Sequence, residues 1–193
     1  VGTRNDVERL AAEVKRRNSR TIVHVDAVQA WMRVPIKLDN IDTLAVSGHK
    51  IHAPKGIGAL YLRRGARIAP LIHGGGQEAG MRSGTSNVPG ACAFAQAAEY
   101  AIEERERTWS HVLSLREHLL GAIARGGFAH ELLVTVPDEA TVVPHILSLH
   151  VRGLEGETVV LRCDNAGFAI SSGSACSSSS LDPSHVLGAI GLS

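Results

Sequence analysis

The sequence is poor in aromatic residues and in net charge, and it has no long hydrophobic run. Only 4% of its 193 residues are aromatic although 44% are hydrophobic, so the core has to come mainly from Ala, Val, Ile and Leu. The 20 basic and 19 acidic side chains leave a net charge of +1, too little to hold a polyanion by bulk electrostatics. No apolar run approaches the roughly 18 residues of a membrane span. We therefore expect no direct nucleic-acid partner and no membrane.

Cysteine is scarce as well. Cys92, Cys163 and Cys176 make an odd number with no short repeated spacing, which fits neither a disulfide framework nor a structural zinc site. A reducing, cytoplasmic location is the expectation. The chain also starts without Met or a signal sequence, and we expect it to be an internal fragment of a longer protein.

The order of the expected elements indicates an α/β protein. A helix is followed by short β-branched strands with short connections, which is typical of an open α/β sheet. The charged run 103–107 marks the expected boundary between a first domain, 1–106, and a second, 107–193. The expected helices are 5–17, 91–102, 109–123, 155–163 and 183–190, and the expected strands are 21–26, 43–46, 57–62, 146–151 and 168–170.

Polar side chains follow two of these strands, at the sheet edge where ligands gather in α/β proteins. Asp26 and Gln29 come after the first strand, and Ser47, His49 and Lys50 come after the second. A lysine amine held beside apolar walls loses proton affinity and becomes a nucleophile for carbonyls. A nucleophilic lysine with a carboxylate for a protonated ring nitrogen is the layout of a pyridoxal phosphate site. Taken alone, however, Lys50 also fits a surface lysine and Asp26 a helix N-cap.

Two further segments carry candidate chemistry. Ser83 and Thr85 lie in a glycine-flanked turn and can donate hydrogen bonds to a phosphate, although such turns are common. Cys176 lies in the Ser-rich loop 171–180, where mobility would let a thiol enter a pocket and leave it again. A plain Gly/Ser linker is the competing interpretation. Cys92 and Cys163, on expected helices, are predicted to be small buried side chains.

Histidine and aspartate suggest one alternative, a metal hydrolase. Its candidate ligands are His24, Asp26, His49, His52 and His73. None of them forms the i, i+4 helical pair of a hydrolase motif, so no metal site is expected.

Six stretches together resemble the pyridoxal-phosphate-dependent cysteine desulfurases of the class V aminotransferase superfamily. They run in family order over nearly the whole chain, and the last, Ser-Ser-Gly-Ser-Ala-Cys, resembles the iron–sulfur-assembly branch. The resemblance implies an aminotransferase fold of type I, with part of the large-domain sheet and most of the small domain. The six stretches are 24–29, 47–50, 54–61, 73–78, 81–85 and 171–176.

The resemblance also implies a role for each candidate residue. Lys50 would bind pyridoxal 5′-phosphate covalently and later move the Cα proton of the substrate, L-cysteine. Cys176 would take the sulfur as a persulfide and pass it to an acceptor protein, either an iron–sulfur scaffold or a sulfur carrier. The remaining residues would hold the cofactor: Asp26 the pyridine nitrogen, Gln29 the phenolic oxygen, Ser47 and His49 the phosphate, and Thr85 the phosphate in the other subunit of a homodimer.

The family pattern also has parts that this sequence lacks. The upstream phosphate-binding turn, the ring-stacking histidine and the downstream arginine for the substrate carboxylate are absent, so the 193 residues alone are expected to bind cofactor poorly and to turn over little cysteine. A selenocysteine lyase has the same chemistry and stays open as an alternative. So does an incompetent half-subunit that needs a second polypeptide.

Overall fold

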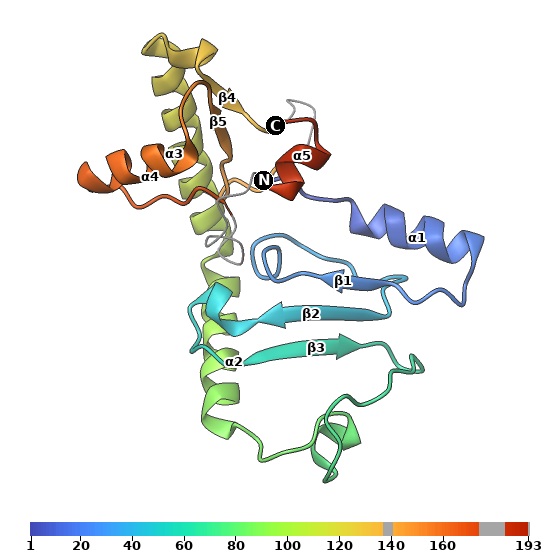
Figure 1. Ribbon diagram of the computed structural model, residues 1–193. Coiled ribbons are helices and arrows are strands. Elements are labelled where there is room, and N and C mark those ends of the chain that lie inside the picture. The colour runs from blue at the N-terminus through green and yellow to red at the C-terminus, as the bar shows by residue number, and fades with distance from the viewer. Residues whose placement is uncertain (137–140, 174–183, 193) are drawn as a thin grey trace. The chain divides into compact units, whose positions relative to one another are not determined.

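The computed structural model describes residues 1–136, 141–173 and 184–192 (Figure 1). The described residues form two compact units, the first built from 1–118 and 141–147 and the second from 119–136, 148–173 and 184–192. The domain boundary expected after residue 106 stays a prediction.

The first unit contains a three-stranded sheet in the order β1-β2-β3. These strands are β1 (His24–Asp26), β2 (Thr43–Ser47) and β3 (Gly58–Leu62). β1 runs parallel to β2 and β3 runs antiparallel to it. The short β2–β3 connection, which holds the 3-10 helix η1 (Gly48–Ile51), explains the antiparallel pairing, because a parallel partner needs a crossover of a dozen or more residues. The carboxyl ends of β1 and β2 therefore lie at one edge of the sheet.

Two helices pack against the core of this sheet, the first through Val7 and Ala11 and the second through Phe94. Asp6 caps α1 (Val7–Arg17) by accepting the Arg9 N–H at 3.0 Å. Asn87 caps α2 (Val88–Glu103) in the same way, and α3 (Arg105–Arg125) follows directly. α2 crosses the sheet where β2 ends and β3 begins (Figure 1). The buried core consists of Ala11, Ala27, Ile41, Leu44 and Val46.

A buried ion pair fixes α1 to the sheet. Lys15 Nζ lies 2.6 Å from Asp42 Oδ2, and both side chains are largely buried. The same carboxylate oxygen accepts the N–H of Val23 at 2.8 Å. Burial raises the pKa of Asp42, but the hydrogen bonds from Lys15 and Val23 outweigh it, so the pKa lies below its usual value. The ion pair therefore stabilises the fold while Asp42 is ionised.

Besides the end of α3, the described part of the second unit contains a two-stranded antiparallel sheet and two further α-helices. Leu132–Val134 (β4) pairs with Leu149–Val151 (β5), and the helices are α4 (Gly156–Asn165) and α5 (His185–Ala189). β4 was not foreseen, and the expected strand 146–151 begins only at Leu149.

The prediction of a strand at 168–170 is wrong. These three residues form no strand, and the Phe168 N–H bonds Cys163 O at 2.8 Å to close the end of α4. Gly167 has a left-handed φ of 83°, which completes this C-terminal cap. The cap uses the amide that a strand would have needed.

Candidate functional site

Two of the predicted site residues share one face and one edge of the β1–β2 pair. Asp26 lies opposite Ala45 in the parallel register, and Ser47 follows Ala45 by two residues. Alternation along a strand therefore puts Asp26 and Ser47 on the same face, opposite to the buried Leu44 and Val46. The structure brings these two side chains to one edge, as the sequence predicted.

Asp26 has one oxygen engaged and one available within the described part of the chain. Its Oδ1 accepts the Val28 N–H at 3.0 Å, which orients the carboxylate at the start of the turn after β1. The side chain is exposed, and Oδ2 has no hydrogen-bond partner among the described residues. An ionised carboxylate with a free oxygen can accept a bond from a protonated ring nitrogen.

Ser47, His49 and Lys50 come together on η1 at the end of β2. The Ser47 hydroxyl and His49 Nδ1 lie 2.8 Å apart, so the two side chains already form a hydrogen-bonded pair. Lys50 is half-buried, and its amine makes no hydrogen bond within the described residues. Gly48 packs tightly here, because an added Cβ would lie 2.9 Å from Ile57 Cγ2 and 3.1 Å from Ala53 Cβ. The glycine of this motif thus lets β2 and η1 approach the 53–57 segment.

The turn after β1 is tied to η1 through a residue that sequence reasoning missed. Arg33 Nη2 donates to the carbonyl of Lys50 at 2.8 Å, and Nη1 reaches the carbonyl of Gln29 at 3.4 Å. Gln29 itself is exposed near the start of this turn. Burial lowers the pKa of Arg33. No pattern in the sequence points to Arg33, because both acceptors are main-chain carbonyls.

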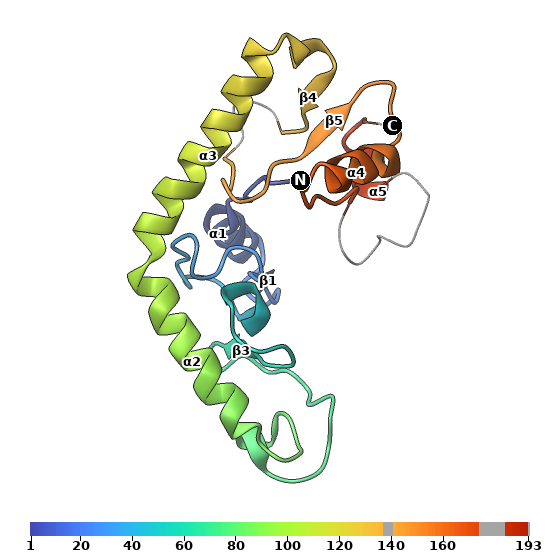
Figure 2. The same cartoon turned by 90° about the vertical axis from the view of Figure 1, so that its left-hand side faces the viewer.

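Thr85 lies in another part of the first unit. Its segment follows η2 (Gln77–Gly80), which lies beyond β3 and away from β1 (Figures 1 and 2). The Ser83 hydroxyl donates to Gly75 O at 2.8 Å and closes this glycine-rich loop, so the buried Ser83 is structural. Thr85 is exposed, and the structure does not group it with Lys50. Its expected role toward a second subunit stays a prediction.

Two of the three cysteines lie within the described residues. Cys176, the predicted sulfur acceptor, lies outside the described residues. Cys92 lies on the outward face of α2 and is exposed. The prediction that its side chain is buried was therefore wrong. Cys163 is half-buried.

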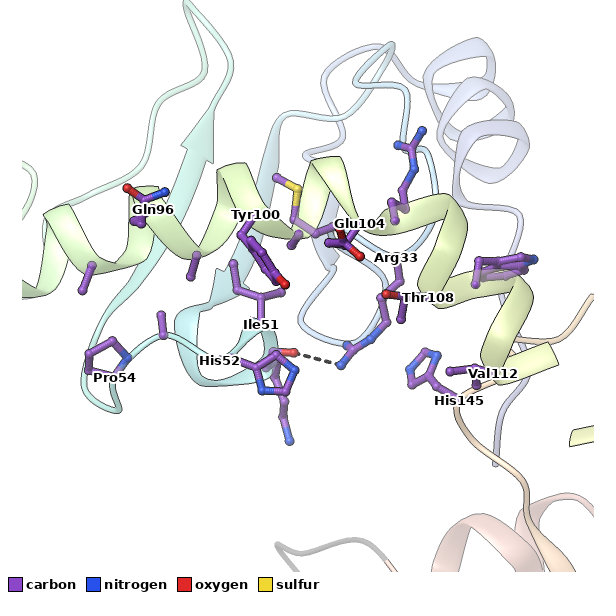
Figure 3. Close-up of a pocket in the computed structure, with 18 of the residues that line it drawn as sticks. Arg33, Ile51, His52, Pro54, Gln96, Tyr100, Glu104, Thr108, Val112 and His145 are labelled. Carbon is purple, nitrogen blue, oxygen red and sulfur yellow. Dashed lines mark hydrogen bonds between the residues drawn. The ribbon is translucent and has the colours of Figure 1, made fainter. Parts of the chain in front are cut away.

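A cavity of about 760 Å³ lies beside η1, within the first unit (Figure 3). Lys50 is the only predicted cofactor-binding residue among those that line it, and Arg33, Tyr100, Glu104 and His145 are also on its wall. Burial and the nearby Arg33 charge lower the pKa of His145 to about 4. Its Nε2 is buried without a hydrogen-bond partner among the described residues. His145 gave no signal in the sequence.

The described residues contain neither a membrane-spanning helix nor a cluster of metal ligands. None of the helices there is both long and apolar enough to cross a membrane. No three His, Cys, Asp or Glu side chains of this part of the chain are placed to hold a metal ion.

The geometry gathers several candidate cofactor-binding residues at one edge of an α/β sheet, and comparison with known proteins identifies the family. The family model described as "Aminotransferase class-V" matches residues 1–193. A cysteine desulfurase of Trichormus azollae is 44% identical over 200 residues, which cover 100% of this chain and 47% of that protein. The chain therefore belongs to the class V aminotransferase family.

Solved structures give the same fold. A NifS-like protein superposes with a TM-score of 0.86 at 38% identity, over 100% of this chain and 49% of its own. A structure described as SspA in complex with cysteine superposes with a TM-score of 0.74 at 33% identity, over 100% and 52% of the two chains. The predicted aminotransferase fold and the predicted family are confirmed. The chain spans about half the length of the curated relatives it matches.

The residues at this edge fit pyridoxal 5′-phosphate, the cofactor of this family. Asp26 offers a carboxylate oxygen for the pyridinium nitrogen, and Lys50 offers an amine for the aldehyde carbon. The Ser47–His49 pair offers a hydroxyl and an imidazole for phosphate oxygens. The donor set therefore matches the cofactor group by group.

Proposed function

We propose that this chain carries the cofactor-binding lysine and the sulfur-accepting cysteine of a pyridoxal-phosphate-dependent cysteine desulfurase. The observation that supports this most is the placement of Asp26 and Ser47 at one edge of the β1–β2 pair, with Lys50 three residues after Ser47 on η1, in a chain 44% identical to a cysteine desulfurase. The SspA structure with bound cysteine supports the choice of substrate. The reaction removes sulfur from L-cysteine and releases L-alanine.

Each cofactor-binding residue has a task that its chemistry suits. Asp26 keeps the ring nitrogen protonated, Ser47 and His49 hold the phosphate, and Gln29 bonds the phenolic oxygen. Lys50 would hold the cofactor at its aldehyde carbon, and its amine would move the proton of the substrate Cα. The bound cofactor supplies a sink for the electron pair left on the substrate carbon.

Cys176 acts as the nucleophile in the sulfur transfer. Its thiolate attacks the substrate sulfur, so that an S–S bond forms as the Cβ–S bond breaks. The electron pair of the broken bond stays with the carbon fragment, which takes up protons and leaves as alanine, and no external oxidant is needed. The sulfur remains on Cys176 as a persulfide and passes to an iron–sulfur scaffold or a sulfur carrier.

Assembly and location belong to the same proposal. Thr85 reaches the cofactor phosphate of a second subunit, which makes the enzyme a homodimer with shared sites. The boundary after residue 106 separates the large domain from a small domain that carries the 171–180 loop. A cytoplasmic location is consistent with the need for free thiols.

The test uses matched variants of the full-length protein that contains these residues. We expect the wild type to be yellow, to be fixed by borohydride at Lys50, and to give equal amounts of alanine and persulfide from cysteine. Lys50→Ala should lose the label, whereas Lys55→Ala, five residues away and exposed, should keep it.

Two cysteine variants separate cofactor binding from sulfur transfer. Cys176→Ser should bind cofactor and form no persulfide, and the exposed Cys92→Ser should act like the wild type. Borohydride label on another lysine would refute the site. Activity with selenocysteine but not cysteine would assign the enzyme as a selenocysteine lyase, and a colourless full-length protein that needs a second polypeptide would support the half-subunit alternative.

A further inference from the structure

We propose that Arg33 is a positioning residue for Lys50, an inference that rests on the cofactor role proposed for Lys50. Its guanidinium donates to the main-chain carbonyl of Lys50 at 2.8 Å, the dashed line at Arg33 in Figure 3. It also reaches the main-chain carbonyl of Gln29 at 3.4 Å. One side chain therefore ties the turn that carries Gln29 to the turn that carries Lys50.

The Lys50 carbonyl needs such a partner. It lies in the last turn of η1, where carbonyl groups receive no N–H from the helix itself. Within the described chain, the main-chain N–H groups of His52 and Ala53 both bond Gly48 O and leave the Lys50 carbonyl to Arg33. A charge-assisted bond from a half-buried arginine is stronger than a neutral one and fixes direction as well as distance.

The backbone on both sides of this contact is held in an unusual conformation. Met32, directly before Arg33, has φ of 62°, and His52, two residues after Lys50, has φ of 69°. Residues other than glycine rarely adopt these angles and keep them only where the surrounding structure determines them. Both residues line the cavity that Arg33 and Lys50 share. The hydrogen bond from Arg33 to the Lys50 carbonyl thus lies between two residues of constrained backbone, as expected of a contact that fixes the position of Lys50.

Nearby groups leave the Arg33 charge free for this role. The adjacent His145 has a pKa lowered to about 4 and is neutral at neutral pH. Glu104, also on the cavity wall, is paired with Arg107. The positive charge of Arg33 therefore acts on the two carbonyl groups.

The test measures how firmly Lys50 holds the cofactor, rather than the stability of the fold. In the full-length, cofactor-loaded protein, Arg33→Met should raise the rate at which hydroxylamine removes the cofactor by tenfold to a hundredfold, the range for loss of one charge-assisted hydrogen bond. kcat should fall by a similar factor while KM changes less than threefold, because the lysine amine is misplaced for proton transfer. Arg33→Lys, which keeps one charged donor, should lie between Arg33→Met and the wild type.

Two controls separate positioning from stability. Asp42→Asn destabilises the same unit without touching η1, and Arg64→Met removes an exposed arginine. Both should leave the hydroxylamine rate within twofold of the wild type, measured well below each unfolding midpoint.

The outcomes are distinct from those of the proposed function. A wild type that binds no cofactor at Lys50 would refute the proposed function. A wild type labelled at Lys50, with a folded Arg33→Met that matches it in rate and kcat, would overturn only the positioning role. Should Arg33→Met not fold, Arg33→Lys decides, and failure of both to fold would show that Arg33 supports the fold instead.

Discussion

The lowered pKa of His145 leads us to expect that the folded protein loses stability in mild acid. This pKa falls from 6.5 to about 4, first because burial disfavours the charged imidazolium and then because Arg33 repels it. A base whose pKa is lower in the folded state takes up its proton preferentially in the unfolded chain. The stability linked to His145 is therefore complete near pH 7.5 and decreases as pH falls below 6.5, until the loss levels off near pH 4.

The magnitude follows from the size of the shift. A drop of about 2.5 pKa units is worth about 3.4 kcal/mol at most, at about 1.36 kcal/mol per unit. Between pH 7.5 and 5 the linkage expression gives about 2 kcal/mol of this. Because His145 is only partly buried, solvent screening reduces the expected effect to about 1 kcal/mol.

The assay compares the pH dependence of unfolding in three proteins. Denaturant unfolding of the wild type, His145→Phe and Thr108→Val should be followed at intervals from pH 7.5 to 5. His145→Phe should lose about 1 kcal/mol less over this range than the wild type. Thr108→Val, a change without a titrating group on the same cavity wall, should follow the wild type. Parallel curves for His145→Phe and the wild type would refute a His145 that stays neutral in the folded protein.

Two further predictions concern the ion pair and the subunit contact. Asp42→Asn should lower the free energy of unfolding by about 2–4 kcal/mol in denaturant melts, because Lys15 would be left buried without its counter-charge, whereas the exposed Asp39→Asn should change little. Because the pKa of Asp42 is lowered, this difference should be full above its unfolded pKa near 3.8 and shrink as pH falls below it; a difference that persists well below that pKa would contradict the assignment. Inactive Lys50→Ala and Thr85→Val proteins should regain activity when their subunits are mixed and exchanged, and no gain in the mixture would exclude a shared site.

Local sequence signals were sufficient for the strand ends and most helices. Asp26 and Ser47 follow short β-branched runs, and pairing two such runs in parallel places their ends at one edge whatever else the chain does. Side-chain alternation then sets the face. For these reasons the sequence could predict the edge on which the candidate cofactor residues lie.

Contacts to the main chain could not be predicted in the same way. Arg33 bonds a carbonyl 17 residues further along the chain, and every residue has a carbonyl, so the sequence carries no mark of that acceptor. His145 reaches the cavity from a segment far from β1, and only the packing around it lowers its pKa. The failed strand at 168–170 has the same origin, because helix capping competes for the Phe168 amide and the residues alone do not show which use prevails.

The candidate site and the core both depend on the register between β1 and β2. The Ala27 N–H bonds Ala45 O at 3.0 Å, and this contact extends the β1–β2 ladder by which Leu44 faces the core while Asp26 and Ser47 face away from it. A slip of one residue would turn every side chain of the strand to the other face, burying a carboxylate or a hydroxyl and exposing an aliphatic residue. The cost of burying these groups thus keeps the candidate cofactor residues at their edge, and a substitution in β2 that allowed a slip would disturb the core and the cofactor site together.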